Sequence, residues 1–380
     1  MTFDLGRWLP AFPIRERYLY LDHAAICPLP RPVAEAMRQR IEDQELTGYE
    51  QFEGWMQQIL GCRHLGAQLI GCAPEDISIV RSTSEGLSCV AEGLALKKGD
   101  EVLVGEEEFA ANVAPWLNLR RRGVRVVRFS QPDGRIDLPE VEARLTSSTR
   151  VIAVSWVAFH TGWVTPLSQL ARLCRDHDAL LVVDAIQGLG VIPFDMRTLG
   201  VDAVVADAHK WLLGPEGAGL MAITPELRSR LNPVLSGWRN TKLDRGSFFM
   251  EKLQFHEDGR RFEPGAGNSV GIAGLAAALD LIQDVGPDVI HARVEMLVRL
   301  LTRILIAHGW EVYSPGSGHP VAGIVAGRHP TVPPRAAVAR LKERRIVCSV
   351  RQGNVRFSPH FYITKGEMEA LDRILEKADL

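Results

Sequence analysis

Seven short apolar runs lie between residues 76 and 223, and stretches with helical periodicity separate most of them. The runs are rich in Val, Ile, Leu and Ala, which is typical of strands that are buried on both faces of a sheet. They are Ile77–Arg81, Glu101–Val104, Val124–Phe129, Val151–Val157, Leu180–Asp184, Ala203–Ala206 and Gly219–Ile223. Helices are expected at Ser84–Leu96, Asn112–Arg122 and Pro166–His177. Strands that alternate with helices of about 10–15 residues predict an α/β fold with a large, doubly wound, mostly parallel seven-stranded sheet.

The pattern changes towards the C-terminus. Residues 225–262 are rich in charged and aromatic residues, which indicates a loop-rich connection. Beyond it we expect helices at Ile272–Val285, Val289–His308, from Pro334 and at Lys365–Lys377, and strands at Trp310–Tyr313, Val321–Ala326, Ile346–Val350 and Val355–Phe357. We therefore predict two domains, a large α/β domain over residues 15–262 and a smaller α+β domain over residues 263–380. The N-terminal segment 1–45, with a helix at Val33–Gln44, is expected to pack near the smaller domain.

Composition and charge narrow the possible environments of this chain. Hydrophobic residues make up 46% of its 380 residues, and the formal net charge of −2 gives no reason to expect nucleic acid or an anionic membrane surface as a partner. No apolar run reaches the roughly 18 residues that span a membrane, and Met1–Trp8 does not resemble a signal peptide. The six cysteines lack the spacing of metal ligands, so we expect reduced thiols, no metal site and a cytoplasmic location.

A lysine interrupts two apolar runs near the middle of the chain. His209 and Lys210 follow the predicted strand Ala203–Ala206, and Trp211 comes next. Burial among apolar neighbours disfavours the ammonium form and lowers the pKa, so that such an amine becomes a nucleophile towards a carbonyl. Taken alone, however, this segment is more typical of a solvated lysine at the end of a strand.

A carboxylate ends another of the predicted strands, Leu180–Asp184. Ligands bind outside the carboxyl ends of the strands in open α/β sheets, so Asp184 and Lys210 are expected to face one crevice. A carboxylate that pairs with a ring N–H, together with a lysine that forms an imine, is what pyridoxal phosphate requires. The two residues therefore predict a pyridoxal-phosphate site.

Five further residues could complete a cofactor site. Thr83 and Ser84 lie where a strand passes into a helix, an arrangement that binds phosphate, although an N-cap role would explain them equally well. Phe109 could stack on the cofactor ring, Gln187 could donate to a ring oxygen, and His209 could donate to the phosphate. A core phenylalanine, a polar turn residue and a backbone-satisfied histidine are the structural alternatives.

Two arginines near the C-terminus are candidates for binding a substrate carboxylate. Arg351 and Arg356 lie in alternating strand sequence, and the planar guanidinium binds a carboxylate through two hydrogen bonds. A surface ion pair is the structural alternative for either residue. Trp238, Arg239 and His360 could line the pocket for the substrate side chain, but each could equally be structural.

Several motifs together identify a family. They are Tyr20–Pro30, Val183–Gly190, Asp207–Gly217, Arg261–Asn268 and Val355–Tyr362. With these motifs, nearly the whole chain resembles the class V aminotransferase-fold enzymes, which are fold-type I and depend on pyridoxal phosphate. The group includes cysteine desulfurases, kynureninases and isopenicillin N epimerase-like proteins, and the chain is most similar to the epimerase-like branch.

The resemblance implies a role for each candidate residue. Lys210 would form the Schiff base with the cofactor, Asp184 would pair with the pyridinium nitrogen, and Gln187 would lie near the ring oxygen. Thr83, Ser84 and His209 would surround the phosphate, with Arg356 on the α-carboxylate of an amino-acid substrate. The resemblance also implies a homodimer in which the segment around Gly265–Asn268 reaches the partner's phosphate.

Some positions depart from the family pattern. Desulfurases carry a catalytic cysteine on a mobile segment shortly before the carboxylate-binding arginine, whereas here only Cys348 is near, in strand-like sequence. Transfer of sulfur to a protein cysteine is therefore not expected. Ala266 replaces a phosphate-binding threonine, so a backbone N–H or Ser269 must substitute. His160 is a possible replacement for an asparagine near the ring oxygen, and Asp207 is unfavourable beside the phosphate unless it faces away.

The expected activity is that of a class V aminotransferase. A β-eliminating C–S lyase that acts on a cysteine derivative and an amino-acid epimerase are the alternatives, because these reactions share their first steps. A cofactor-free binding protein would not need the pair Asp184 and Lys210. Pro193 occupies the position of the third glycine in a dinucleotide-binding pattern that begins at Gly188, which disfavours a nicotinamide oxidoreductase.

Overall fold

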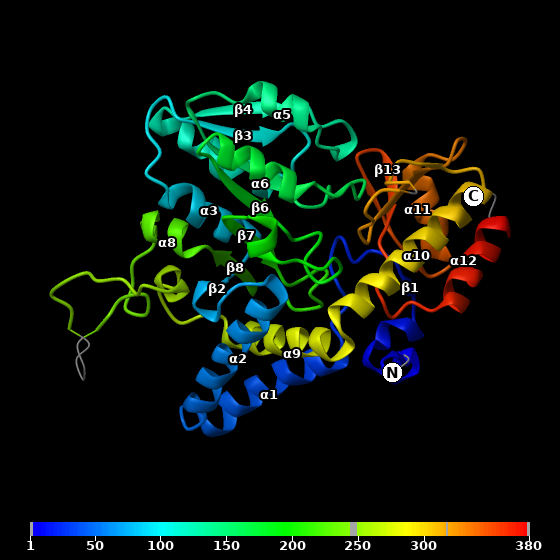
Figure 1. Ribbon diagram of the computed structural model, residues 1–380. Helices are drawn as coiled ribbons and strands as arrows, with labels where there is room; N and C mark the ends of the chain where they lie inside the picture. Colours follow the sequence, from blue (N-terminus) through cyan, green and yellow to red (C-terminus); the bar gives the residue numbers. More distant parts are fainter. Residues whose placement is uncertain (1–2, 244–248, 317, 378–380) are drawn as a thin grey trace.

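A seven-stranded sheet forms the centre of the computed structural model, which describes residues 3–243, 249–316 and 318–377 (Figure 1). Its strand order is β2-β8-β7-β6-β5-β3-β4. The strands are β2 (Ile77–Val80), β3 (Glu101–Gly105), β4 (Arg125–Phe129), β5 (Thr149–Ser155), β6 (Leu180–Asp184), β7 (Ala203–Asp207) and β8 (Gly219–Ile223). Strand β8 pairs antiparallel with both of its neighbours, and the remaining pairs are parallel. The predicted α/β class and the mostly parallel sheet are confirmed.

A four-stranded antiparallel sheet lies beside the first one, on the right in Figure 1. Its strand order is β12-β13-β10-β9, with β9 at Glu311–Val312, β10 at Val325–Arg328, β12 at Ser349–Arg351 and β13 at Asn354–Phe357. Strand β1 (Leu19–Tyr20) pairs in parallel with β11 (Ile346–Val347), so the N-terminal segment joins the C-terminal part of the chain.

Helices cover both sheets. They are α1 (Arg31–Thr47), α2 (Phe52–Ile70), α3 (Thr83–Gly93), α4 (Ala114–Asn118), α5 (Leu138–Arg144), α6 (Leu167–Asp176), α7 (Met196–Leu199), α8 (Pro225–Arg230), α9 (Ser269–Val285), α10 (Pro287–Ala307), α11 (Pro334–Glu343) and α12 (Lys365–Lys377). Helix α9 packs against α1 and α2 (Figure 1). The domain boundary at residues 262 and 263 stays a prediction. None of the helices in the described part of the chain is both long and apolar enough to cross a membrane.

Two regions differ from the expected helices. Helix α2 was not predicted, because Gly54, Gly61 and Gly66 lower its helix propensity. At Gly66 an added Cβ would lie 3.0 Å from the side chain of Leu220 in β8, so this glycine lets the helix approach the sheet. The expected helix Asn112–Arg122 is instead short α4 with 3₁₀ turns on both sides, since Pro115 favours a helix start and interrupts a longer one.

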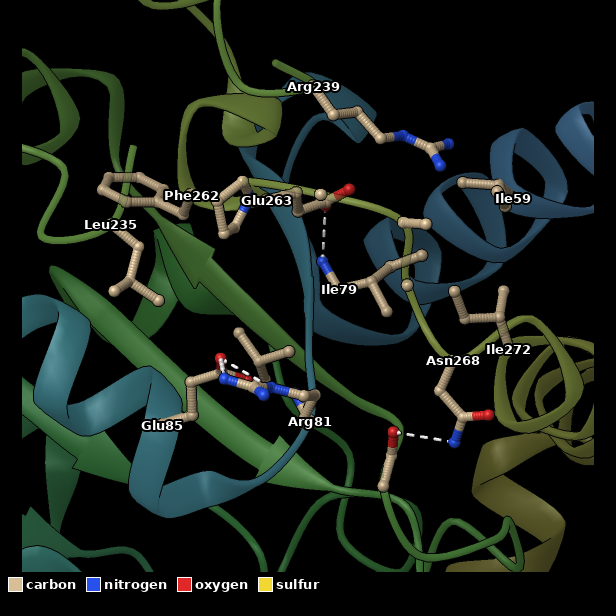
Figure 2. Close-up of a pocket in the computed structure, with 16 residues that line it drawn as sticks. Ile59, Ile79, Arg81, Glu85, Leu235, Arg239, Phe262, Glu263, Asn268 and Ile272 are labelled. Atoms are coloured by element: carbon tan, nitrogen blue, oxygen red, sulfur yellow. Dashed lines mark hydrogen bonds and ion pairs between the residues drawn. The ribbon is translucent and has the colours of Figure 1, made fainter. Parts of the chain in front are cut away.

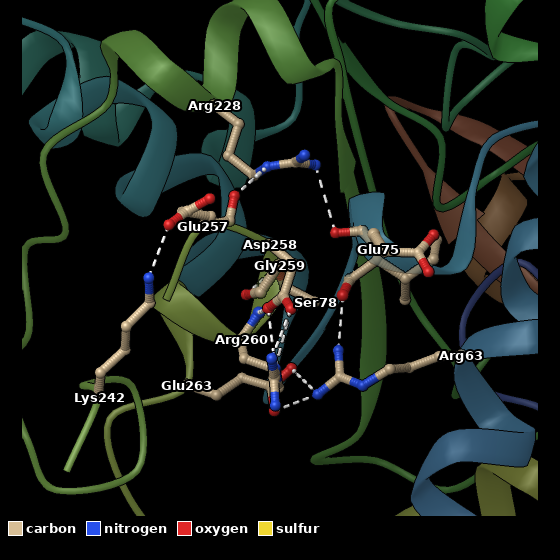
Figure 3. A network of polar contacts seen from close by, with 11 residues as sticks. Arg63, Glu75, Ser78, Arg228, Lys242, Glu257, Asp258, Gly259, Arg260 and Glu263 are labelled. Carbon is tan, nitrogen blue, oxygen red and sulfur yellow. Dashed lines mark hydrogen bonds and ion pairs between the residues drawn. The ribbon is translucent and has the colours of Figure 1, made fainter. Parts of the chain in front are cut away.

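The expected loop-rich connection contains α8 and a 3₁₀ turn at Gly259–Phe262. Residues 244–248 of that connection lie outside the described residues. A buried ion pair attaches its end to the sheet: the guanidinium of Arg63 donates to both carboxylate oxygens of Glu263 at 2.7 Å (Figure 3). Glu263 also accepts from the N–H of Ile79 at 2.8 Å. These bonds hold the turn that follows Glu263 next to β2.

Replacing Glu263 by glutamine is expected to lower the free energy of unfolding by about 3 kcal/mol, because it leaves the buried Arg63 charge unpaired. Urea unfolding measures this change. The matched control is Glu295→Gln, which breaks the more exposed pair with Arg299 on α10 and should cost at most about 0.5 kcal/mol. Equal losses for the two variants would contradict the importance of the buried pair.

Candidate active site

A cavity of about 260 Å³ opens at the carboxyl ends of β6 and β7, beside loops that follow β3 and β5. All eight residues predicted for the site line it: Thr83, Ser84, Phe109, Asp184, Gln187, His209, Lys210 and Arg356. Arg351 and Phe159 line it as well. The topology explains this assembly, because β6 and β7 are parallel neighbours and their carboxyl ends meet at one edge of the sheet.

Asp184 and Lys210 form the buried centre of the cavity. Asp184 is the last residue of β6, is 2% exposed, and accepts a hydrogen bond from the N–H of Ile186 at 3.0 Å. Burial raises the pKa of Asp184 to about 6, although the N–H of Ile186 and the Lys210 charge oppose this effect. Burial lowers the pKa of Lys210 to about 8, with Asp184 opposing and Arg356 adding to the decrease. A useful fraction of the amine is therefore neutral and nucleophilic near pH 7.

The N-terminus of α3 supplies the anion-binding side of the cavity. Ser82 is the N-cap, and its hydroxyl accepts from the N–H of Glu85 at 3.1 Å. Thr83 and Ser84 therefore need not cap the helix. The Thr83 hydroxyl accepts from the N–H of Asp207 at 3.0 Å, and its own hydrogen has no acceptor among the described residues, so it can be donated to a ligand. An added Cβ at Gly86 would lie 2.5 Å from the side chain of Val205, so a glycine is needed for α3 to pack this closely on β7.

The carboxylate of Asp207 lines the cavity but is bound by its own loop. It accepts from the N–H of Ala208 at 2.7 Å, and its Oδ2 lies 3.1 Å from Nδ1 of His209. The N–H of Ala208 compensates part of the Asp207 charge, which would otherwise repel a bound phosphate. The contact with His209 lacks hydrogen-bond geometry, and Nδ1 of His209 has no hydrogen-bond partner among the described residues.

Arg356 is almost completely buried and keeps one donor unused. Its Nη1 donates to the carbonyl of Phe159 at 2.8 Å, and its Nη2 donates to Oδ1 of Asp22 at 3.2 Å. Its Nε finds no hydrogen-bond partner within the described residues. Burial lowers the pKa of Arg356 to about 10, so the group remains charged at neutral pH.

Asp22, which accepts a hydrogen bond from Arg356, was not predicted as part of the site. The only available signal was its place in the motif Tyr20–Pro30, which by itself indicated no role. Asp22 follows β1 and also accepts from the hydroxyl of Ser349 at 2.8 Å. Because 334 positions separate it from Arg356, this pairing could not be predicted from local pattern.

Several other candidates do not line this cavity. His160 lies 3.0 Å from a carboxylate oxygen of Glu107 and is not a replacement for the asparagine near the ring oxygen. His360 is fully buried, and both of its ring nitrogens bind backbone groups. Trp238 is 54% exposed and lies outside the cavity. Each of these side chains meets a nearer partner, or solvent, that sequence spacing does not reveal.

A second cavity, of about 330 Å³, lies beyond Arg81 and Glu85 (Figure 2). Arg239 and the turn 264–268, which includes Ala266, line this second cavity and not that of Lys210. Ser269 begins α9, and the side chain of Asn268 caps this helix by accepting from the N–H of Gly271. Within one chain, therefore, the turn does not reach the Lys210 cavity.

Comparison with known proteins identifies the family. The model of the family described as aminotransferase class-V matches residues 19–369. The chain belongs to this family. It is 29% identical to a probable cysteine desulfurase of Methanothermobacter thermautotrophicus and 28% identical to the uncharacterized aminotransferase YcbU of Bacillus subtilis. Both similarities cover 96% of this chain and 96% of the relative.

Solved structures of a third protein, C-DES, are also similar. A C-DES mutant with glycine covalently linked to its PLP cofactor superposes with a TM-score of 0.90 at 25% identity, covering 97% of this chain and 98% of that one. Another structure is the complex of the cystine C–S lyase C-DES with its product, cysteine persulfide. The expectation that sulfur is not transferred to a protein cysteine gains no support from relatives that are named cysteine desulfurases, whereas an aminotransferase remains consistent with the family.

The pKa of Lys210 predicts how the reactivity of its free amine depends on pH. Acylation of Lys210 in the cofactor-free protein, followed by peptide mass mapping, should increase through a midpoint near pH 8, because burial favours the neutral amine. In Asp184→Asn the midpoint should move to lower pH, since the carboxylate that favours the ammonium form is gone. A midpoint near 10.5, the ordinary value for lysine, would show that the amine is not desolvated.

Proposed function

We propose that this chain is a pyridoxal-phosphate-dependent enzyme that acts at the α-carbon of an amino acid, with Lys210 as the lysine that binds the cofactor. One observation carries the proposal: the desolvated Lys210 amine and the buried carboxylate of Asp184 line one cavity, between the N-terminus of α3 and Arg356. The PLP cofactor of the similar C-DES protein supports the proposal.

The residues present fit the proposed cofactor. When bound, pyridoxal phosphate withdraws electrons from the α-carbon of an attached amino acid. Asp184 would pair with its ring nitrogen, and Phe109, whose ring centre lies 5.7 Å from Nζ of Lys210, would stack on the ring. The hydroxyls of Thr83 and Ser84 and the first N–H groups of α3 would hold the phosphate with His209.

Arg356 would bind the α-carboxylate of the substrate, since its Nε has no partner among the described residues and a guanidinium binds a carboxylate through paired donors. Lys210, once released, would remove the α-proton as a general base. The pKa of about 8 suits this task, because the amine can both lose and accept a proton near neutral pH.

Transamination is the overall reaction that the sequence predicts, and membership of the class-V aminotransferase family supports it. A second candidate, β-elimination from a cysteine derivative, is favoured by the C–S lyase activity named for C-DES. Arg351 also favours it. In the described part of the chain this arginine lines the cavity and donates only to the carbonyl of Val350, so its guanidinium could bind the second carboxylate of a substrate such as cystine.

Sulfur transfer to a protein cysteine is not proposed. The described residues include all six cysteines, and no cysteine side chain among them lines the cavity. Cys348 is 8% exposed, and burial raises the pKa of its thiol, which disfavours the reactive thiolate. The family resemblance implies a homodimer. This stays a prediction, and the mass of the purified protein in analytical sedimentation would test it.

The purified protein, loaded with pyridoxal phosphate, is expected to absorb visible light. Borohydride should remove this band and leave a phosphopyridoxyl group on Lys210, detected by peptide mass mapping. Lys210→Ala should keep the fold, seen by circular dichroism, but lose the adduct and at least about 10³-fold in turnover, because the covalent attachment and the base are both removed. A colourless protein that the cofactor cannot reconstitute would refute the proposal.

Product analysis separates the candidate reactions. A transaminase should require an α-keto acid and release the keto acid of its substrate, whereas a C–S lyase should convert cystine and water into pyruvate, ammonia and cysteine persulfide without a keto-acid acceptor. Solvent deuterium that enters the α-position with loss of stereochemistry would indicate an epimerase. Cys348→Ser should retain the activity within about twofold; its complete loss would instead indicate a protein-bound sulfur intermediate.

A further inference from the structure

The side chain of Trp211, the residue after Lys210, is bonded to a residue of the cavity wall. Its indole Nε1–H donates to Oε1 of Gln187 at 2.8 Å. The amide nitrogen of Gln187 donates in the opposite direction, to the carbonyl of Ala24 at 3.0 Å. Gln187 is 3% exposed and lines the cavity with Lys210. The amide is therefore held between two buried partners at the edge of the site.

The two hydrogen-bond partners of Gln187 cannot exchange the roles of donor and acceptor. An indole nitrogen is a hydrogen-bond donor and never an acceptor, whereas a carbonyl oxygen is an acceptor and never a donor. If the Gln187 amide were rotated by half a turn, its NH₂ group would face the indole N–H of Trp211, donor against donor. Its oxygen would then face the carbonyl oxygen of Ala24, acceptor against acceptor. Leaving such buried groups unsatisfied costs more than a typical hydrogen bond contributes. The amide therefore has one orientation, in which the second N–H of its nitrogen has no partner among the described residues.

The packing around Trp211 fixes the position of the donor. An added Cβ at Gly323 would lie 2.0 Å from the far edge of the indole ring, and one at Gly190 would lie 2.5 Å from the Trp211 carbonyl oxygen. That carbonyl also accepts a hydrogen bond from Nε2 of His360 at 3.2 Å. The indole is fully buried. Because both the ring and the backbone of Trp211 are confined, the indole N–H has a fixed position, and Gln187 must point its oxygen there to keep the bond.

We infer that Trp211 is a positioning residue, which holds the Gln187 amide so that a single N–H is presented to the ring oxygen of the bound cofactor. This inference rests on the proposed function. The bond from Trp211 matters because a free glutamine amide could present its oxygen instead, and that oxygen would repel an anionic ring oxygen. The tryptophan and the carbonyl of Ala24 thus together determine the sign of the dipole that faces the cofactor, although the tryptophan does not line the cavity.

The expected consequence is spectroscopic. With pyridoxal phosphate bound, a donor beside its ring oxygen would stabilise the anionic form of that oxygen and lower its affinity for a proton. This lowers the pH at which the visible absorption band changes. A hydrogen bond to a charged group is strong enough to shift that midpoint by about one pH unit.

The test is a pH titration of the visible absorption of the cofactor-loaded protein. Trp211→Phe, and separately benzothienylalanine at position 211, which replaces N–H by sulfur and keeps the shape of the ring, should raise the midpoint. Gln187→Leu should raise it by about one unit, and adding Trp211→Phe to this variant should change nothing further. The matched control is Trp116→Phe, since Trp116 is fully buried and its Nε1 has no partner in the described residues.

The outcomes separate this inference from the proposed function. A wild-type protein that forms no borohydride-stable adduct at Lys210 would refute the proposed function. If the wild type titrates and Gln187→Leu shifts the midpoint, but both Trp211 variants titrate like the wild type, Trp211 has no positioning role. A further shift when the Trp211 and Gln187 changes are combined would also overturn the inference, because the tryptophan would then act by another route.

Discussion

Desolvation of a lysine and a carboxylate at the ends of two adjacent parallel strands is the constraint on which the site depends. Burial alone would leave both groups neutral, since it raises the pKa of Asp184 and lowers that of Lys210. Their attraction opposes both changes, so the carboxylate stays charged and the pKa of the amine, about 8, lies close to physiological pH. Strands β6 and β7 make this balance possible, because neighbouring parallel strands deliver their last residues to the same buried edge.

The other charges of the cavity are arranged around that pair. Arg356 adds a buried positive charge that lowers the pKa of Lys210, and Asp22 compensates this arginine from the N-terminal segment. Asp207 accepts a hydrogen bond from the N–H of Ala208 and lies beside His209. Each buried charge therefore has a local partner, which is what makes several of them tolerable in one cavity. The free donors that remain are those that a ligand would occupy.

The family and the reaction class depend on different features. In the proposed function, the lysine, the aspartate and the helix N-terminus would serve steps that the candidate reactions share, so they indicate the family more readily than the product. The fate of the substrate depends on groups that face it after the first proton transfer. No cysteine among the described residues reaches the cavity, although several relatives are named cysteine desulfurases. Cleavage of a C–S bond would then have to proceed without a protein thiol.

The pattern of apolar and polar residues was sufficient to predict the sheet and most of the residues of the candidate site. Continuous apolar runs predicted all seven strands, since burial on both faces leaves a strong local signal, and Asp184 and Lys210 could be located from the ends of those strands. Helix α2 was missed because its glycines weaken the local signal while improving its packing. Asp22 with Arg356, and Trp211 with Gln187, could be decided only by the tertiary structure. These pairs join segments that are distant in the chain or point in directions that strand and helix periodicity does not specify, and only the packed fold brings their polar atoms within hydrogen-bond distance.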